Sequence, residues 1–159
     1  MHITILSVGR LKEKYLREAQ GEYLKRLQSH ARVNVVEVAD EPVKEGISPA
    51  MEDAVRFREG ERLLKHLKSG TYTVALDREG SQLTSEELSE FISGLGLKGS
   101  SDITFVIGGT LGLSEAILQS AQFRLSFSKM TFPHQLMRVV LLEQLYRSFK
   151  IARGEPYHK

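Results

Sequence analysis

Residues 103–112 read Ile103-Thr104-Phe105-Val106-Ile107-Gly108-Gly109-Thr110-Leu111-Gly112, and they give the clearest indication of the fold class. After Thr104 its first half is apolar at every position, which is typical of a strand covered on both faces of a parallel sheet. The glycines that follow free the backbone for a tight turn and expose N–H donors. Ligands of α/β sheets bind outside the carboxyl ends of the strands. The stretch therefore predicts a buried strand that ends in a candidate binding turn.

The spacing within this turn narrows what it can bind. Gly-Gly-x-x-Gly is not the dinucleotide fingerprint, and no Asp or Glu lies about 20 residues further on. No Lys-Ser or Lys-Thr pair follows, so the turn is not a phosphate-binding P-loop. A plain tight turn remains the alternative interpretation.

Strands and helices alternate on both sides of this stretch. Apolar runs predict strands at residues 3–8, 33–38, 71–76, 103–107 and 123–127. Helical spacing and capping signals predict helices at residues 11–27, 49–68, 84–92, 114–121 and 134–151. This alternation predicts an α/β fold with a mainly parallel sheet flanked by helices. The length of 159 residues predicts one domain over residues 1–159.

Composition excludes several classes of protein. The absence of cysteine excludes a disulfide scaffold, a thiolate zinc site, an iron–sulfur cluster and a cysteine nucleophile. The histidines show no metal-ligand spacing, so we expect no metal. No apolar run approaches the roughly 20 residues of a membrane helix, and the N-terminus has no secretory pattern. We therefore expect a cytoplasmic protein with no membrane partner.

Charge is unevenly distributed along the chain. The net charge of +2 is too small to imply a polyanionic partner by itself. Basic residues nevertheless dominate residues 10–32 and 129–159, whereas acidic residues concentrate between residues 40 and 90. Two solvated helix faces would explain the basic ends, and so would two surfaces that face RNA.

The last predicted helix, at residues 134–151, is apolar in almost every direction. A helix of this kind is buried on more than one side. One side can face the sheet, and the other is most simply covered by a second copy of the chain. This pattern predicts a homodimer, and the alternative is a helix enclosed within one chain.

The segment at residues 125–134 is the second candidate site. It reads Leu-Ser-Phe-Ser-Lys-Met-Thr-Phe-Pro-His, a short strand followed by hydroxyls, apolar side chains and one lysine. Such a segment could line an adenine-sized pocket whose backbone amides read ring nitrogens. Met130 and Phe132 are otherwise ordinary core residues, and His134 at a helix start is otherwise a surface or capping residue.

Polar residues near the C-terminus form the remaining candidates. Glu143 and Arg147 have i, i+4 spacing on one face of the last helix, either as a surface ion pair or as a desolvated functional pair. The tail at residues 153–159 combines Tyr157, His158 and cations. Aromatic rings stack on bases and cations meet phosphates, so the tail suits RNA, although chain ends also commonly fray. His158 is well suited to proton transfer.

Four blocks occur together and in order: the glycine turn, residues 125–135, the helix block at residues 138–147, and the terminal Pro-Tyr-His-Lys. With the start at residues 5–15, they make the chain similar over essentially its whole length to the RlmH family. This is the bacterial 23S rRNA (pseudouridine-N3)-methyltransferase family of the SPOUT class. Many members have a polar residue at the position of Leu111.

The resemblance implies a SPOUT-type sheet with a deep C-terminal trefoil knot, an exception to the rule that chains are unknotted. It implies a homodimer that uses S-adenosyl-L-methionine to methylate N3 of pseudouridine 1915, in helix 69 of 23S rRNA, within the assembled 70S ribosome. The family's cofactor positions correspond here to Leu76, Gly108, Phe127, Ser128, Lys129, Met130, Thr131 and Phe132. Leu76 looks like ordinary strand core from its sequence.

The resemblance also places the last helix and the Tyr-His tail near the methyl site, with the partner subunit contributing. The expected catalytic residues are His158, Arg147, Glu143 and Tyr157. Arg147 and the tail would position the uracil ring, and His158 or Glu143 would relay the N3 proton. Three alternatives remain: an enzyme of the same fold that acts on tRNA, a ribosome-associated protein without catalysis, and a nucleotide-binding regulator.

Overall fold

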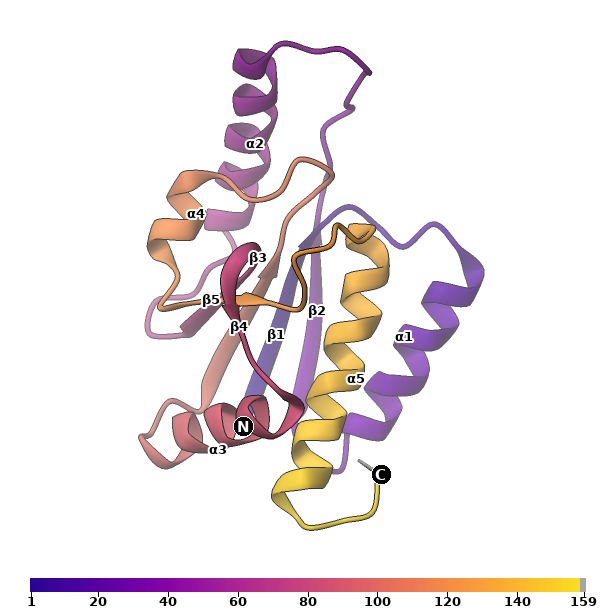
Figure 1. The fold of residues 1–159 in the computed structure, drawn as a ribbon, viewed down its shortest axis with the longest axis vertical. Helices are drawn as coiled ribbons and strands as arrows, with labels where there is room; N and C mark the ends of the chain where they lie inside the picture. Colours follow the sequence, from indigo (N-terminus) through magenta and orange to yellow (C-terminus); the bar gives the residue numbers. More distant parts are fainter. Residues whose placement is uncertain (158–159) are drawn as a thin grey trace.

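A computed structural model describes residues 1–157 and shows one sheet of five parallel strands (Figure 1). The strand order is β2-β1-β4-β3-β5. The strands are β1 (His2–Val8), β2 (Arg32–Val38), β3 (Tyr72–Gln82), β4 (Asp102–Ile107) and β5 (Phe123–Ser126). The helices are α1 (Lys14–Leu27), α2 (Pro49–Leu64), α3 (Ser85–Leu97), α4 (Glu115–Ser120) and α5 (His134–Ala152). The predicted α/β class, element order and parallel sheet are confirmed.

Helices cover both faces of the sheet. Alternate residues of β1 point to opposite sides: Ile3 and Ile5 enter a core with α1, α3 and α5, whereas Leu6 and Val8 enter a core with α2 and α4. All four side chains are fully buried. The apolar pattern of the central strands therefore reflects two separate cores, as expected for a sheet covered on both faces.

Some element boundaries differ from the predictions. The predicted strand at residues 71–76 continues to Gln82, because residues 77–80 form an irregularity after which β3 pairs again with β5. The predicted helix at residues 11–27 begins only at Lys14. The carbonyls of Leu11 and Lys12 instead accept hydrogen bonds from Arg17, at 3.2 and 2.6 Å. The second helix ends at Leu64 and the third continues to Leu97.

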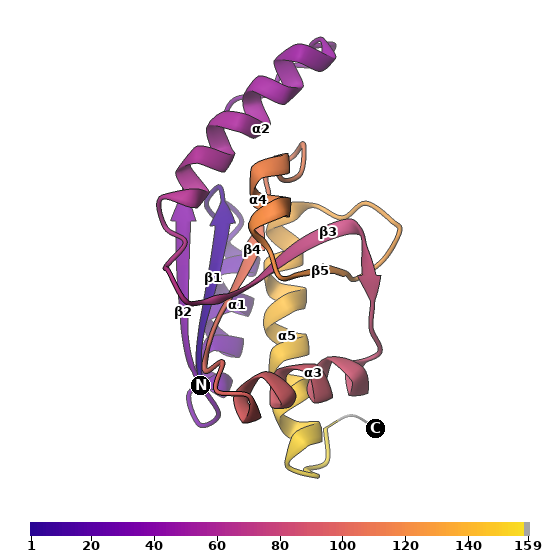
Figure 2. The same ribbon diagram turned by 90° about the vertical axis from the view of Figure 1, so that its left-hand side faces the viewer.

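The last helix, α5, packs between α1 and α3 (Figures 1 and 2). One face is buried and contains Leu141, Leu142 and Leu145. The opposite face carries Leu136, which is exposed, and Val139, which is half-buried. The basic ends of the sequence thus lie side by side as α1 and α5.

The strands β1, β2 and β4 end at the same edge of the sheet, and α2 projects beyond the rest of the chain on that side (Figures 1 and 2). Within residues 1–157, no helix has both the length and the apolar character needed to cross a membrane.

Candidate functional site

A cleft of about 500 Å³ opens at this carboxyl edge. Its walls come from the irregular part of β3, the glycine turn after β4, the segment between β5 and α5, and the first turn of α5. Two side chains of α2, Glu52 and Arg56, complete the rim. Both segments singled out in the sequence therefore line the same cleft. Of the eight predicted cofactor residues, seven line it: Leu76, Gly108, Phe127, Ser128, Met130, Thr131 and Phe132; Lys129 is not among the lining residues.

The glycine turn is too tightly packed for larger residues. A Cβ atom on Gly108 would lie 2.7 Å from the carbonyl carbon of Gly112, and Gly112 itself has a φ of 84°. The amide of Gly112 donates a 3.1 Å hydrogen bond to the carbonyl of Gly109, which closes the turn. Such contacts bring the backbone itself to the wall of the cleft.

The buried Glu59 of α2 supports the same turn from behind. Its Oε1 accepts a 2.9 Å hydrogen bond from the amide of Glu41, and its Oε2 would lie 2.7 Å from a Cβ atom on Gly109. Burial raises the pKa of the Glu59 carboxyl. No hydrogen-bond partner for Oε2 lies among residues 1–157. The sequence offers no signal for this contact, because Glu59 resembles its exposed helical neighbours.

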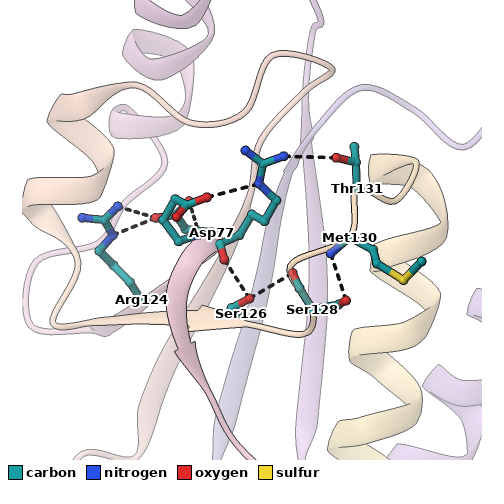
Figure 3. Close-up of polar contacts among 8 residues, drawn as sticks. Asp77, Arg124, Ser126, Ser128, Met130 and Thr131 are labelled. Carbon is teal, nitrogen blue, oxygen red and sulfur yellow. Dashed lines mark hydrogen bonds and ion pairs between the residues drawn. The ribbon is translucent and has the colours of Figure 1, made fainter.

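Hydrogen bonds hold the segment after β5 against the irregular part of β3 (Figure 3). The hydroxyl of Ser126 lies 3.0 Å from the carbonyl of Arg78 and 3.1 Å from that of Ser128. Arg78 Nη1 donates to Thr131 Oγ1 at 3.3 Å, and Met130 N donates to Ser128 Oγ at 3.0 Å. These bonds shape the wall that Ser128, Met130 and Thr131 present to the cleft.

Asp77 and Arg78 are site residues that sequence reasoning missed. Asp77 forms an ion pair with Arg124 of β5, with Arg124 Nε 2.8 Å from Asp77 Oδ2 (Figure 3). A Cβ atom on Gly80 would lie 2.5 Å from the carbonyl oxygen of Arg124, so only glycine fits where β3 runs this close to β5. The cluster Asp-Arg-Glu-Gly after an apolar run is the only sequence signal for this irregularity.

His134, the first residue of α5, lies half-buried on the wall of the cleft. Its Nε2 would be 3.3 Å from a Cβ atom on Gly9, the residue that follows β1 and has a φ of 81°. Burial lowers the pKa of His134, and the positive charges of Arg138 and Lys12 lower it further, against the opposing effect of Asp40. The imidazole is therefore neutral at physiological pH.

One turn further along α5, Arg138 is fully buried beneath the cleft. Its guanidinium forms an ion pair with Glu37 at the end of β2, and Nη2 donates a 2.8 Å hydrogen bond to the carbonyl of Gly9. Arg138 thus ties the first turns of α5 to the ends of β1 and β2.

The predicted catalytic residues of the last helix and tail form a different cluster. Arg147 Nε donates a 3.0 Å hydrogen bond to Glu143 Oε1, and the hydroxyl of Tyr157 lies 3.4 Å from the same oxygen. The Arg147 guanidinium lies 4.9 Å from the centroid of the Tyr157 ring. The pair is largely shielded from water, since 23% of the Arg147 side chain and 18% of the Glu143 side chain are exposed.

This environment shifts two proton affinities. Hydrogen bonding to Glu143 raises the pKa of Arg147. Burial, followed by hydrogen bonding with Tyr23, raises the pKa of Tyr157 to about 12. Tyr157 is therefore a neutral phenol at physiological pH. The fourth predicted catalytic residue, His158, lies outside the described residues.

The cleft and this cluster are separated within one chain. Glu143 follows His134 by nine residues on α5, which corresponds to about 13 Å along a helix axis. The structure therefore unites the predicted cofactor residues with one another but not with Glu143, Arg147 and Tyr157. Within residues 1–157, no three acidic or histidine side chains are grouped to hold a metal ion.

Comparisons with known proteins agree with this description. Residues 1–158 match a family model described as predicted SPOUT methyltransferase. Two proteins named ribosomal RNA large subunit methyltransferase H are similar over nearly their whole lengths. The one from Pelotomaculum thermopropionicum is 60% identical over 99% of this chain and 98% of its own. The one from Clostridium kluyveri is 54% identical over the full length of both chains.

A solved structure supports the fold alone. A probable methylase family protein from Haemophilus influenzae Rd KW20 is similar over 99% of this chain and 70% of its own, with a TM-score of 0.55 and 12% sequence identity.

Proposed function

The chain belongs to the SPOUT methyltransferase family and, within it, to the RlmH group, and on this premise we propose that it methylates large-subunit ribosomal RNA. The methyl donor is S-adenosyl-L-methionine. The acceptor is N3 of pseudouridine 1915 in helix 69 of 23S rRNA, within the assembled 70S ribosome. The enzyme acts in the cytoplasm, where ribosomes are.

One observation carries the proposal: seven of the eight predicted cofactor residues come from three separate parts of the chain and converge on one cleft. They are Leu76, Gly108, Phe127, Ser128, Met130, Thr131 and Phe132. Its volume of about 500 Å³ falls in the usual range of small-molecule sites. Its lining suits a ligand with an apolar ring system and polar ends, since Leu76, Phe127 and Phe132 lie beside exposed backbone and hydroxyls. Lys129 belongs to the same segment, and we propose that it too binds the cofactor.

The residues of the chain would act by positioning. When bound in the cleft, S-adenosylmethionine supplies a methyl group that its sulfonium has already activated. The glycine turn and the segment after β5 hold that group and exclude water. Alignment of this kind contributes many orders of magnitude to rate. Arg147 and Tyr157 hold the uracil ring and its carbonyl oxygens, and His158 belongs to the same tail.

We propose further that the active form is a homodimer built on α5. The outer face of α5 carries Leu136, Val139 and Val140, which no element of the described chain covers fully. A second groove of about 340 Å³ continues from it and includes Phe132 and Gln144. A partner packed there in the opposite direction would bring its tail cluster to this chain's cleft. The separation of about 13 Å within one chain supports this arrangement.

The family also supports two structural proposals. Residues 1–159 act as a single SPOUT methyltransferase domain, and the C-terminal part of its fold is a trefoil knot. Sedimentation at several concentrations tests the dimer, and a monomer that retains full activity would contradict it.

Transfer of labelled methyl groups from S-adenosylmethionine tests the function. The acceptors are 70S ribosomes from cells that lack this modification, separate subunits and bulk tRNA, and mass spectrometry locates the label. We expect label on the helix 69 pseudouridine in 70S particles only. Label on tRNA alone would replace the substrate but keep the cofactor. Cofactor binding without label on any RNA would indicate a protein without catalysis.

A further inference from the structure

Methylation of N3 requires that the N3 proton leave, and the carboxylates on the wall of the cleft are poorly placed to take it. Glu52 is paired with Arg56, Asp77 with Arg124, and Glu79 with Arg78. Each of these carboxylates thus already interacts with an arginine side chain. These three are the carboxylates among the described residues that line the cleft.

Both carboxylate oxygens of Glu143 also accept hydrogen bonds from neighbouring side chains. Its Oε1 accepts hydrogen bonds from Arg147 and Tyr157, and its Oε2 accepts a 2.7 Å hydrogen bond from Gln144. A carboxylate in this setting holds the side chains around it in place. It therefore suits positioning of the uracil better than proton transfer.

His134 also lines the cleft, but unlike these carboxylates it forms no ion pair among the described residues. It is the first residue of α5, where the positive end of the helix dipole disfavours a second positive charge. Arg138 and Lys12 act in the same direction, and Asp40 opposes them. A neutral imidazole on the wall of the cleft has a free ring nitrogen that can accept a proton, as general-base catalysis requires.

We propose that His134 is the catalytic base that accepts the N3 proton of the target pseudouridine, an assignment that rests on the function proposed above. The N3–H bond breaks and its proton passes to the imidazole. The electron pair left on N3 forms the new bond to the methyl carbon. The bond from that carbon to sulfur breaks, and its electron pair stays on sulfur. The imidazolium then returns its proton to water.

The network beneath the cleft prepares His134 for this role. Arg138 fixes the helix turn below it to Gly9 and Glu37, and Gly9 lies directly against the imidazole. The basic loop after β1 is joined to the same turn, because Lys12 N donates a 3.2 Å hydrogen bond to Gln135 Oε1. A pseudouridine that enters the cleft over this loop would come close to the His134 imidazole and to the basic side chains of the loop.

The test compares wild-type enzyme with His134→Asn in single-turnover methyl transfer to 70S ribosomes between pH 5 and 9. We expect the substitution to lower the rate constant by about 100-fold. The wild-type rate should rise with pH and level off near the pKa of His134, below 6.5, whereas the variant should keep rising with hydroxide. Imidazole added to His134→Ala should restore part of the rate.

Two readouts besides activity separate this role from a structural one. Calorimetry should show that His134→Asn still binds S-adenosylmethionine, and nuclear magnetic resonance of labelled histidine should give a pKa for His134 that matches the kinetic one. His66→Asn is the matched control, because His66 is exposed beyond the end of α2. It should leave the rate and its pH profile unchanged.

The outcomes are distinct. An active wild type with an equally active His134→Asn and an unchanged pH profile overturns the assignment but leaves the proposed function standing. Loss of the pH dependence in His158→Asn and not in His134→Asn moves the role to the tail. Inactive wild-type enzyme on every particle overturns the proposed function, and the assignment with it.

Discussion

The two ends of α5 carry two different kinds of site. At its beginning lies a concave cleft, built from backbone turns and from side chains such as His134 that face open space. About 13 Å further along lies the cluster of Glu143, Arg147 and Tyr157, whose polar groups bind one another. The cleft is a concave space that can hold a ligand. The cluster instead presents a guanidinium group and an aromatic ring that other side chains hold in place.

This difference indicates how the work is divided. The cleft depends on close backbone packing, so it should be sensitive to small steric changes. The cluster depends on side-chain chemistry, so it should tolerate such changes but respond to loss of a functional group. Both are supported by one helix, and in a dimer each could complete the other.

The largest expected effect is a loss of stability when Arg138, near the start of α5, is replaced. Arg138→Met removes the buried partner of Glu37 and the hydrogen bond to Gly9, and we expect unfolding to require about 3 kcal/mol less free energy. For a chain of this size that lowers Tm by roughly 6–12 °C in calorimetry. The control is Arg26→Met, which breaks an exposed i, i+4 pair with Glu22 and should cost no more than about 0.5 kcal/mol. Equal shifts for the two variants would contradict a special role for Arg138.

A single methyl group added to the glycine turn should weaken cofactor binding in the cleft. Gly108→Ala places a Cβ atom 2.7 Å from the backbone of Gly112, and overpacking of this kind costs about 2 kcal/mol. We expect S-adenosylmethionine affinity to fall by roughly 30-fold in calorimetric titration. Gly94→Ala is the control, because open space surrounds Gly94 in α3, and it should bind the cofactor normally.

A change in the cluster of Glu143, Arg147 and Tyr157 should instead slow methyl transfer without weakening cofactor binding. Tyr157→Phe removes the hydroxyl beside Glu143 but keeps the ring over Arg147, so we expect about tenfold slower methyl transfer with unchanged cofactor affinity. Mixing Tyr157→Phe chains with Gly108→Ala chains sharpens the comparison. If the tail serves the partner's cleft, mixed dimers contain one intact site and regain activity. Mixtures no more active than their separate components would place the tail and cleft of one chain together.

A smaller effect concerns a histidine in each region. Burial lowers the pKa of His134 at the cleft and of His30, which stacks on Phe149 near the tail. Below pH 6.5 the unfolded chain binds protons more readily than the folded chain, so the free energy of unfolding should fall as pH decreases. Urea unfolding at pH 7.5 and 5.5 should show a smaller difference in His30→Gln and in His134→Asn than in wild type. An unchanged difference in both variants would assign the acid sensitivity to other groups.

The smallest effect should come from the basic loop beside the cleft. Arg10→Ala removes one exposed cation, and we expect ribosome affinity to fall only a few-fold while the slope of log affinity against log salt decreases by about 0.7–0.9. Arg32→Ala, at the opposite edge of the sheet, is the charge-matched control. The same change in slope for both variants would mean that charge acts without a defined contact.

Much of the site was predictable because its signals are local. The glycine turn and the segment at residues 125–134 stood out by composition, and both line the cleft. Leu76 entered only through family resemblance, since the end of a buried strand looks the same in sequence whether it faces a core or a cleft. For Asp77 and Arg78 the sequence offers only the Asp-Arg-Glu-Gly cluster after an apolar run, and for Glu59 it offers no signal, because the roles of these residues depend on contacts with distant residues.

The helices and strands follow from local sequence signals, because apolar periodicity, capping residues and glycines act over a few neighbouring residues. Most of these elements lie where their residues predict them. The tertiary structure alone decided which segments meet. Because β3 lies between β4 and β5, Leu76 comes beside residues 127–132, which are some 50 positions away. Arg138 likewise joins three elements only because Glu37, near the end of β2, and Gly9, just after β1, lie within reach of its side chain. Such pairings depend on strand order, which short-range preferences do not specify.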